Sequence, residues 1–121
     1  MSLAFWIVTL AVVMGAGLAV LFLRPVWPRS AWLAVTHGLV GTGGLALLVL
    51  ALNTPDARAD ALGVGAFAKF TALAISGAWL LGLGLAFWRF GTPRGRGLLI
   101  AVHASFAVFG YVLFMAYRSL G

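Results

Sequence analysis

Four long apolar runs, separated by short polar gaps, account for nearly the whole chain. The runs extend over residues 3–23, 31–52, 64–88 and 97–117. Each has about 20 residues or more, and at about 1.5 Å per residue this length crosses the roughly 30 Å hydrocarbon core of a bilayer. The pattern therefore predicts a single transmembrane domain over residues 1–121, made of four spanning helices.

The gaps between the runs contain the residues that end helices. All four prolines, at positions 25, 28, 55 and 93, fall in these gaps. Gaps this short make consecutive helices antiparallel neighbours. We therefore expect an all-α membrane protein folded as an up-down-up-down four-helix bundle. The first run has no basic segment before it and is longer than the apolar part of a signal peptide, so we expect it to be retained.

Composition narrows the function classes. The chain is 64% hydrophobic and 8% charged, which excludes an ordinary soluble domain. The net charge of +6 does not indicate nucleic-acid binding, because the eight basic residues are dispersed and lie mostly between the apolar runs. There is no cysteine, and both carboxylates, Asp56 and Asp60, lie in one gap. Thiolate chemistry and a carboxylate pair inside the bundle are thereby excluded, and we predict no catalytic residue.

The arginines predict the orientation of the bundle in the membrane. The first and third gaps together hold Arg24, Arg29, Arg89, Arg94 and Arg96. The opposite face is nearly neutral, with Asp56, Arg58, Asp60 and Arg118. By the positive-inside rule, loops 24–30 and 89–96 are cytoplasmic and both termini lie outside. We expect the protein in a bacterial inner membrane, with Trp27, Trp32 and Trp88 at the cytoplasmic interface and Trp6 at the other.

The second and fourth runs resemble each other. Residues 33–44 read LAVTHGLVGTGG and residues 99–110 read LIAVHASFAVFG, and each segment has a glycine seven positions after its histidine. The two histidines are 66 positions apart, while Gly17 matches Gly82 at a separation of 65. One inserted loop residue reconciles these separations. Our hypothesis is that the chain is a duplicated two-helix hairpin.

His37 and His103 are the only histidines of the protein, and both lie inside apolar runs at matching depth. An ionisable side chain in a membrane span is costly and points to function, although a histidine can also simply bond a neighbouring carbonyl. In the expected bundle, the second and fourth helices occupy diagonal corners. Both histidines can then face the central axis and hold a flat ligand from its two sides.

Small residues follow each histidine on the same helix face. They lie four and seven positions further on, at Gly41 and Gly44 in one helix and at Ala107 and Gly110 in the other. We expect them to leave a slot for a macrocycle, the alternative being that they serve close helix packing.

Haem is the ligand that best fits two opposed imidazoles in an apolar slot. Since no CxxCH motif is present, we predict one non-covalent haem b with His37 and His103 as its metal ligands. The candidate partners of its propionates are Arg29, Arg94 and Arg96.

The arrangement resembles the small membrane b-type cytochromes, in which four helices hold haem between histidines on two of them. The resemblance covers the bundle and the two segments 37–44 and 103–110. It implies electron transport rather than catalysis at iron, because two histidines fill both axial positions. Cytochrome b561-like proteins carry more histidines and often two haems, whereas this chain can ligate one. A single haem requires a quinone, or a redox centre in a partner, as its redox partner.

Two alternatives remain open at this point. One is a cofactor-free accessory subunit that packs against a larger membrane complex through its glycine-rich faces. The other is a (bacterio)chlorophyll-binding subunit, in which the histidines face outward to partner chains. In each case we expect the lipid bilayer and either partner membrane subunits or further copies of the chain as partners, and no nucleic acid.

Overall fold

The computed structural model describes residues 2–23, 31–54, 57–87 and 92–120. It contains four long helices, α1 (Ser2–Leu23), α2 (Ala31–Leu52), α4 (Gly65–Phe87) and α5 (Pro93–Leu120), and one short helix, α3 (Ala57–Ala61). Each long helix is long and apolar enough to cross a membrane. The prediction of an integral membrane protein with four spans is confirmed.

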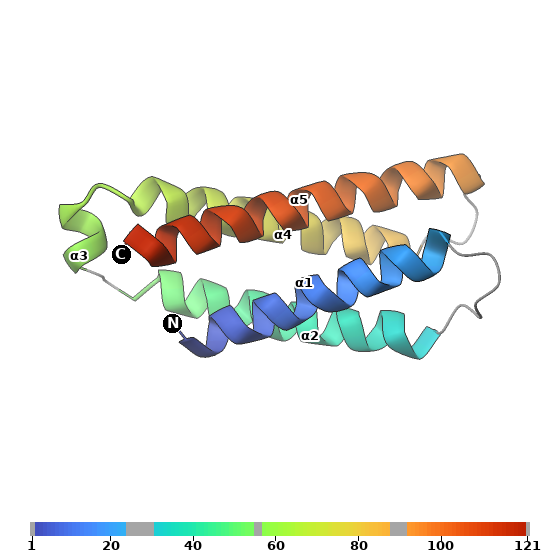
Figure 1. Ribbon diagram of the computed structural model, residues 1–121, viewed down its shortest axis with the longest axis horizontal. Helices are drawn as coiled ribbons and strands as arrows, with labels where there is room; N and C mark the ends of the chain where they lie inside the picture. Colours follow the sequence, from blue (N-terminus) through green and yellow to red (C-terminus); the bar gives the residue numbers. More distant parts are fainter. Residues whose placement is uncertain (1, 24–30, 55–56, 88–91, 121) are drawn as a thin grey trace.

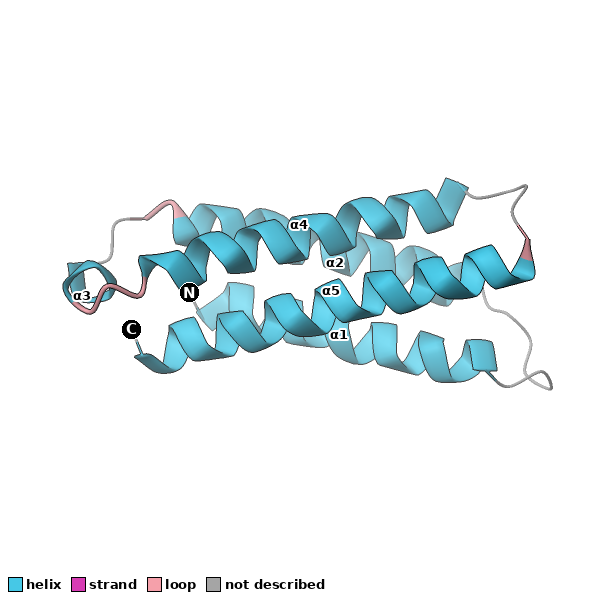
Figure 2. Ribbon diagram, turned by 90° about the horizontal axis from the view of Figure 1, so that it is seen from above, coloured by secondary structure: helices cyan, strands magenta, loops and turns pink. Residues whose placement is uncertain are grey.

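The long helices pack as an up-down-up-down bundle, as predicted (Figures 1 and 2). α1 packs along α2, and α4 packs along α5, so that the chain forms two hairpins. The hairpins meet where α2 packs on α4 and α1 packs on α5, which leaves α2 and α5 on one diagonal. The beginning of α1, the end of α5 and the short α3 lie at one end of the bundle, which we call the terminal end. The opposite end, where α2 and α5 begin, is the arginine end.

The last helix is longer than the sequence predicts. We expected it to begin at residue 97 and Pro93 to lie in a loop, but α5 begins at Pro93. Proline is well suited to the first position of a helix, where no backbone N–H is needed. Thr92 caps this first turn, because its Oγ1 accepts a hydrogen bond of 3.1 Å from the backbone N–H of Gly95.

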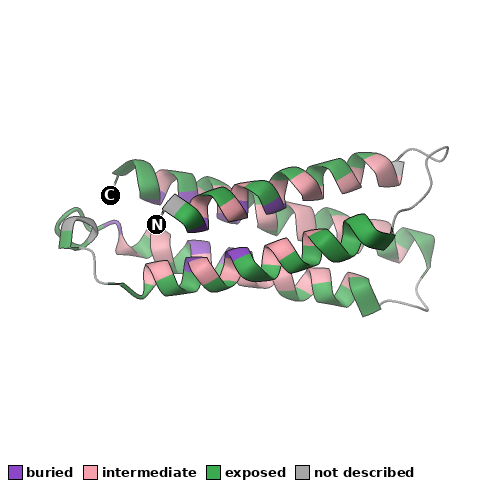
Figure 3. Ribbon diagram, turned by 90° about the horizontal axis from the view of Figure 1, so that it is seen from below, coloured by how far each residue is buried: buried purple, intermediate pink, exposed green. Residues whose placement is uncertain are grey.

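Buried side chains are confined to one half of the bundle (Figure 3). In this packed half, which comprises residues 2–11, 44–52, 64–78 and 110–120, the side chains of Leu48, Thr71 and Phe114 are fully enclosed. In the open half, residues 12–22, 31–43, 79–87 and 92–109, every residue with a described side chain is at least partly exposed. The packed half lies toward the terminal end and the open half toward the arginine end.

The two hairpins repeat the same packing. Gly44 of α2 lies against Ile7 and Val8 of α1, and Gly110 of α5 lies against Ala74 and Ile75 of α4. Positions in α1 and α4 therefore correspond at a separation of 67, and positions in α2 and α5 at 66. The buried residues follow the same offsets, in the pairs Ala4 and Thr71, Val8 and Ile75, Ala11 and Ala78, and Leu48 and Phe114.

The register of this repeat differs by two residues from the expected one in α1. Gly15, not Gly17, corresponds to Gly82, and Gly17 corresponds to Gly84. Each helix has two glycines separated by one residue, so the letters alone allow either alignment. The helix contacts decide between them, because α1 and α4 must meet equivalent residues of their partner helices.

Candidate histidine site

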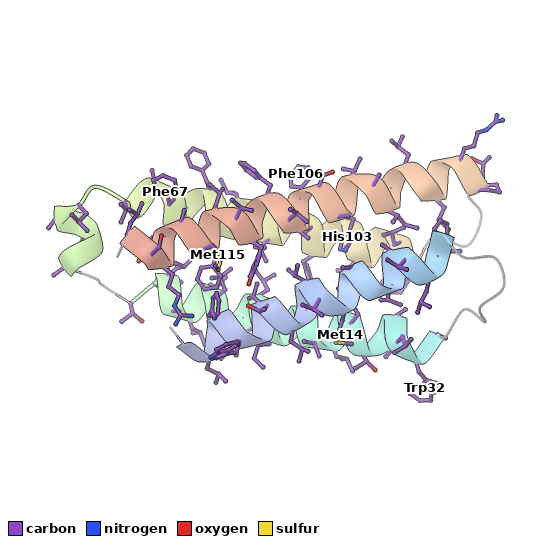
Figure 4. All side chains as sticks on the ribbon, in the orientation of Figure 1. Met14, Trp32, Phe67, His103, Phe106 and Met115 are labelled. Carbon is purple, nitrogen blue, oxygen red and sulfur yellow. The ribbon has the colours of Figure 1, made fainter. Side chains whose placement is uncertain are left out.

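The structure brings the two histidines together in the open half of the bundle. His37 projects from α2 and His103 from α5, and their ring centroids are 6.1 Å apart with the ring planes at 88°. Figure 4 shows the side chain of His103 among the helices, whereas the labelled Trp32 points away from them. The two histidines come from different hairpins and are 66 positions apart in the sequence, yet they form one site.

The helix repeat explains why both rings reach the same place. Each histidine lies seven residues, nearly two turns, before a glycine that is buried in its own hairpin, Gly44 or Gly110. Residues seven apart share one helix face. Both histidines therefore project from the inward faces of the hairpins. They lie nearly two helical turns from the packed half, toward the arginine end.

His103 is held by a hydrogen bond to the neighbouring helix of its hairpin. Its Nδ1 lies 2.7 Å from the carbonyl oxygen of Ala78 in α4. A carbonyl oxygen can only accept, so Nδ1 carries the proton and donates it, and Nε2 keeps its lone pair. A histidine that ligates a metal is commonly held in this way, with its other ring nitrogen donating to a carbonyl.

His37 lies in the equivalent scaffold, but its contact with the neighbouring helix is weaker. Ala11, which corresponds to Ala78, presents its backbone to the ring. The Nδ1 of His37 is nevertheless buried and has no hydrogen-bond partner in the described part of the chain. The two imidazoles therefore differ in how firmly they are oriented, although they occupy corresponding positions.

Each imidazole ring contacts a glycine of the neighbouring helix. A Cβ on Gly15 would lie 3.0 Å from Cε1 of His37, and a Cβ on Gly82 would lie 3.2 Å from Cε1 of His103. Both distances are too short for a methyl group without movement of the ring. In the sequence, Gly15 and Gly82 stand out only as small residues of neighbouring helices. They are 67 positions apart and the histidines are 66 apart, and this near-equal spacing is the signal that could have paired each glycine with a ring.

The other small residues divide into two groups. Side chains of the neighbouring helix fill the space beside Gly44 and Gly110, so the slot that we expected there does not exist. These two glycines serve close packing within the hairpins. Beside Gly41, no atom lies within 4 Å of the position of a Cβ, and Ala107 is half-buried. The contact of these last two with a cofactor stays a prediction.

The arginines lie at some distance from the rings. Arg94 and Arg96 are exposed in the first turn of α5. Arg96 precedes His103 by seven residues, about 10 Å along the helix axis, and Arg94 by nine residues, about 13 Å. Arg29 lies outside the described residues. Pairing of these arginines with propionates stays a prediction.

Two polar contacts between the hairpins were not anticipated from the sequence. Thr9 of α1 and Tyr111 of α5 share a hydrogen bond of 2.9 Å between their hydroxyls. Trp79 of α4 donates from Nε1 to Oγ1 of Thr42 in α2 at 2.9 Å. Interhelical hydrogen bonds of this kind stabilise membrane bundles. The first bond links α1 to α5 and the second links α4 to α2, so each interface between the hairpins has one. Neither bond involves a histidine.

The donor set limits the kind of metal centre that could form. The described residues contain no group of three or more His, Cys, Asp or Glu side chains that could hold an ion. A structural zinc ion requires four protein ligands, and a catalytic one requires three. Two imidazoles alone complete the coordination of a metal only if another molecule, such as a macrocycle, supplies the remaining ligands.

Comparison with known proteins finds no matching family model, no matching curated protein and no matching solved structure. The resemblance to small membrane b-type cytochromes thus depends on the bundle and the histidine pair.

Proposed function

We propose that this protein is a membrane b-type haem protein that carries electrons, with His37 and His103 as the two axial ligands of one haem. The observation that carries the proposal is the 6.1 Å separation of the two imidazole centroids across the diagonal of the bundle. A metal–imidazole bond is about 2 Å long and the ring centre lies about 1 Å further, so two imidazoles on opposite sides of one metal have centres about 6 Å apart.

The open half of the bundle supports the same proposal. A macrocycle needs space around the metal in the plane between the rings. In the packed half such space is filled by side chains such as Leu48 and Phe114. Around the histidines, all described side chains retain exposed surface. A haem there would displace no enclosed side chain of the described residues.

Electron transport follows from the ligand set. With an imidazole on each side of the iron, no position is left for a substrate in the resting protein, and the remaining chemistry of haem is the exchange of one electron. The site lies toward the arginine end, which the charge distribution assigns to the cytoplasm. A single haem there exchanges electrons with a quinone or with a redox centre of a partner subunit.

The alternatives account for the geometry less well. A (bacterio)chlorophyll subunit needs each histidine to face a separate pigment, whereas here the two ring centroids lie only 6.1 Å apart. A cofactor-free subunit gives no role to two histidines whose ring centroids lie 6.1 Å apart.

The test is a reduced-minus-oxidised visible spectrum of the detergent-purified protein. We expect a b-type spectrum in the wild type that is lost or altered in His37→Ala and in His103→Ala. Thr36→Ala and Ser105→Ala are matched controls, because these hydroxyls lie beside the histidines but bond only to carbonyls of their own helices. A stable wild-type protein that stays colourless after haem is supplied would exclude the proposal, and far-red absorption would favour a chlorophyll.

Electron paramagnetic resonance of the oxidised protein gives a second readout. The imidazole planes are nearly perpendicular, at 88°. The π orbital of each imidazole is perpendicular to its ring plane. With perpendicular ring planes, each imidazole would interact with a different one of the two iron dπ orbitals, which would keep these two orbitals nearly equal in energy. We therefore expect a low-spin signal with large g anisotropy, and a rhombic signal would indicate that the rings turn parallel when haem binds.

A further inference from the structure

We propose that the two axial ligands are unequal, and that His37 is the exchangeable one, so that its side of the iron admits a small neutral ligand such as carbon monoxide. This inference rests on the proposed haem function and assigns a ligand class to the same site. It starts from the difference between two imidazoles that occupy equivalent places in the two hairpins.

The equivalence of the scaffold isolates the difference. Ala11 and Ala78 present their backbones to the two rings, and Gly15 and Gly82 lie against them. Both histidines lie seven residues before a packed glycine. The main distinction is that Nδ1 of His103 bonds the carbonyl of Ala78 at 2.7 Å, while Nδ1 of His37 is buried and its contact with the backbone of Ala11 does not reach hydrogen-bond geometry.

This hydrogen bond affects metal ligation in two ways. It keeps a proton on Nδ1, so that Nε2 is the nitrogen that would bind the metal. It also makes the imidazole a more basic metal ligand. Loss of such an outer partner commonly weakens metal binding by about 10-fold to 100-fold. His103 is therefore the permanent ligand, and the bond from His37 to the iron is the weaker one.

The surroundings of His37 also leave it room to move away. Gly41, one turn further along the same side of α2, has no atom within 4 Å of the position of a Cβ. No residue of α2 between positions 31 and 43 is buried. Without His37, that side of the iron would suit a small uncharged ligand, because the hydroxyl and indole groups of Thr36, Thr42, Trp79 and Ser105 in this half already have hydrogen-bond partners.

The experiment uses the full-length protein loaded with haem, reduced, and titrated with carbon monoxide. We expect the wild type to bind carbon monoxide with loss of the bis-histidine spectrum. His37→Ala should retain haem and bind carbon monoxide more tightly than the wild type, while His103→Ala should lose haem more readily than His37→Ala does. Equal haem loss in the two variants, or greater loss in His37→Ala, would overturn the inference.

Glycine substitutions provide a second test that keeps both histidines. Gly15→Ala places a methyl group 3.0 Å from Cε1 of His37 and should weaken that ligand, which raises carbon monoxide affinity with haem retained. Gly82→Ala crowds His103 at 3.2 Å and should promote haem loss. Gly17→Ala is the control, since no atom lies within 4 Å of its Cβ position. Identical behaviour of Gly15→Ala and Gly82→Ala would contradict the inequality.

The outcomes separate this inference from the proposed function. A wild-type protein that takes up no haem would exclude both the proposed function and the exchange of His37. A wild type with a bis-histidine spectrum that does not bind carbon monoxide, and whose two alanine variants lose haem alike, supports the haem site and rejects only the exchange of His37.

Discussion

The packed and open halves of the bundle are built from the same four helices, yet only one of them has a core. In the packed half, Leu48 and Phe114 are enclosed at corresponding positions of α2 and α5. In the open half, α2 and α5 carry the histidines at corresponding positions, and no residue with a described side chain is buried as a whole. The difference indicates that packing holds the helices together mainly in one half.

The residue types explain the difference. Where glycine meets a branched side chain of the adjacent helix, as Gly44 meets Val8 and Gly110 meets Ile75, the helices approach closely and the contact is filled. In the open half, several glycines face no side chain at all. These are Gly17, Gly38, Gly41 and Gly43. Because Gly17, Gly38 and Gly43 are exposed, they add no packing contact between helices.

The largest expected effect is the loss of a core side chain from the packed half. Phe114→Ala should lower the free energy of unfolding by about 3–5 kcal/mol, because it removes a fully enclosed ring and leaves a cavity. Phe109→Ala, on an exposed face of α5 in the open half, should change it by only about 0.5 kcal/mol. Unfolding in mixed detergent micelles measures both. Similar losses for the two variants would mean that the halves do not differ in packing.

Haem should act on the open half. Backbone hydrogen exchange is expected to be faster over residues 31–43 than over 44–52 in the haem-free protein, since the first segment packs less. At 100 times its dissociation constant, haem stabilises the folded protein by about 2.7 kcal/mol and should slow exchange mainly in the open half. His103→Ala is the control, and slowing that persists in that variant would contradict binding at the histidines.

A methyl group added inside a hairpin contact should cost less than a lost core ring. Gly110→Ala places a Cβ 2.8 Å from Ile75 and 3.1 Å from Ala74, and overpacking of this kind costs about 1–3 kcal/mol. Gly44→Ala, with its nearest contact at 3.3 Å, should be milder. Gly41→Ala in the open half meets nothing within 4 Å and should be neutral or slightly stabilising. Unfolding midpoints in this order would support the difference in packing between the two halves, and a reversed order would contradict it.

The smallest expected effect concerns the hydroxyl pair between α1 and α5. Tyr111→Phe removes the 2.9 Å bond to Thr9 and should cost about 0.6 kcal/mol, the typical value of an interhelical hydrogen bond in a membrane. A double-mutant cycle with Thr9→Ala isolates the pair. Coupling near zero would show that Thr9, which also bonds the carbonyl of Phe5 at 2.7 Å, is satisfied without the tyrosine.

The class of the fold could be predicted from the sequence, but some details could not. Hydropathy and the short gaps determine four antiparallel spans, because lipid leaves few alternatives for long apolar runs. The beginning of α5 was missed by four residues, since Pro93 either ends a loop or begins a helix and only the capping contact of Thr92 distinguishes these roles. The alignment of Gly15 with Gly82 also required helix contacts, because both helices carry two similarly spaced glycines.

The location in the membrane, the alternating direction of the helices and the matching depth of the two histidines can be read from the residues alone. Hydropathy and length carry this information, since each is a property of one helix at a time. Tertiary packing sets the 6.1 Å between the rings of His37 and His103, the filled contacts at Gly44 and Gly110, and the hydrogen bond that holds His103 more firmly than His37. These facts depend on how the hairpins rotate and approach one another, which is set by side-chain packing across the bundle.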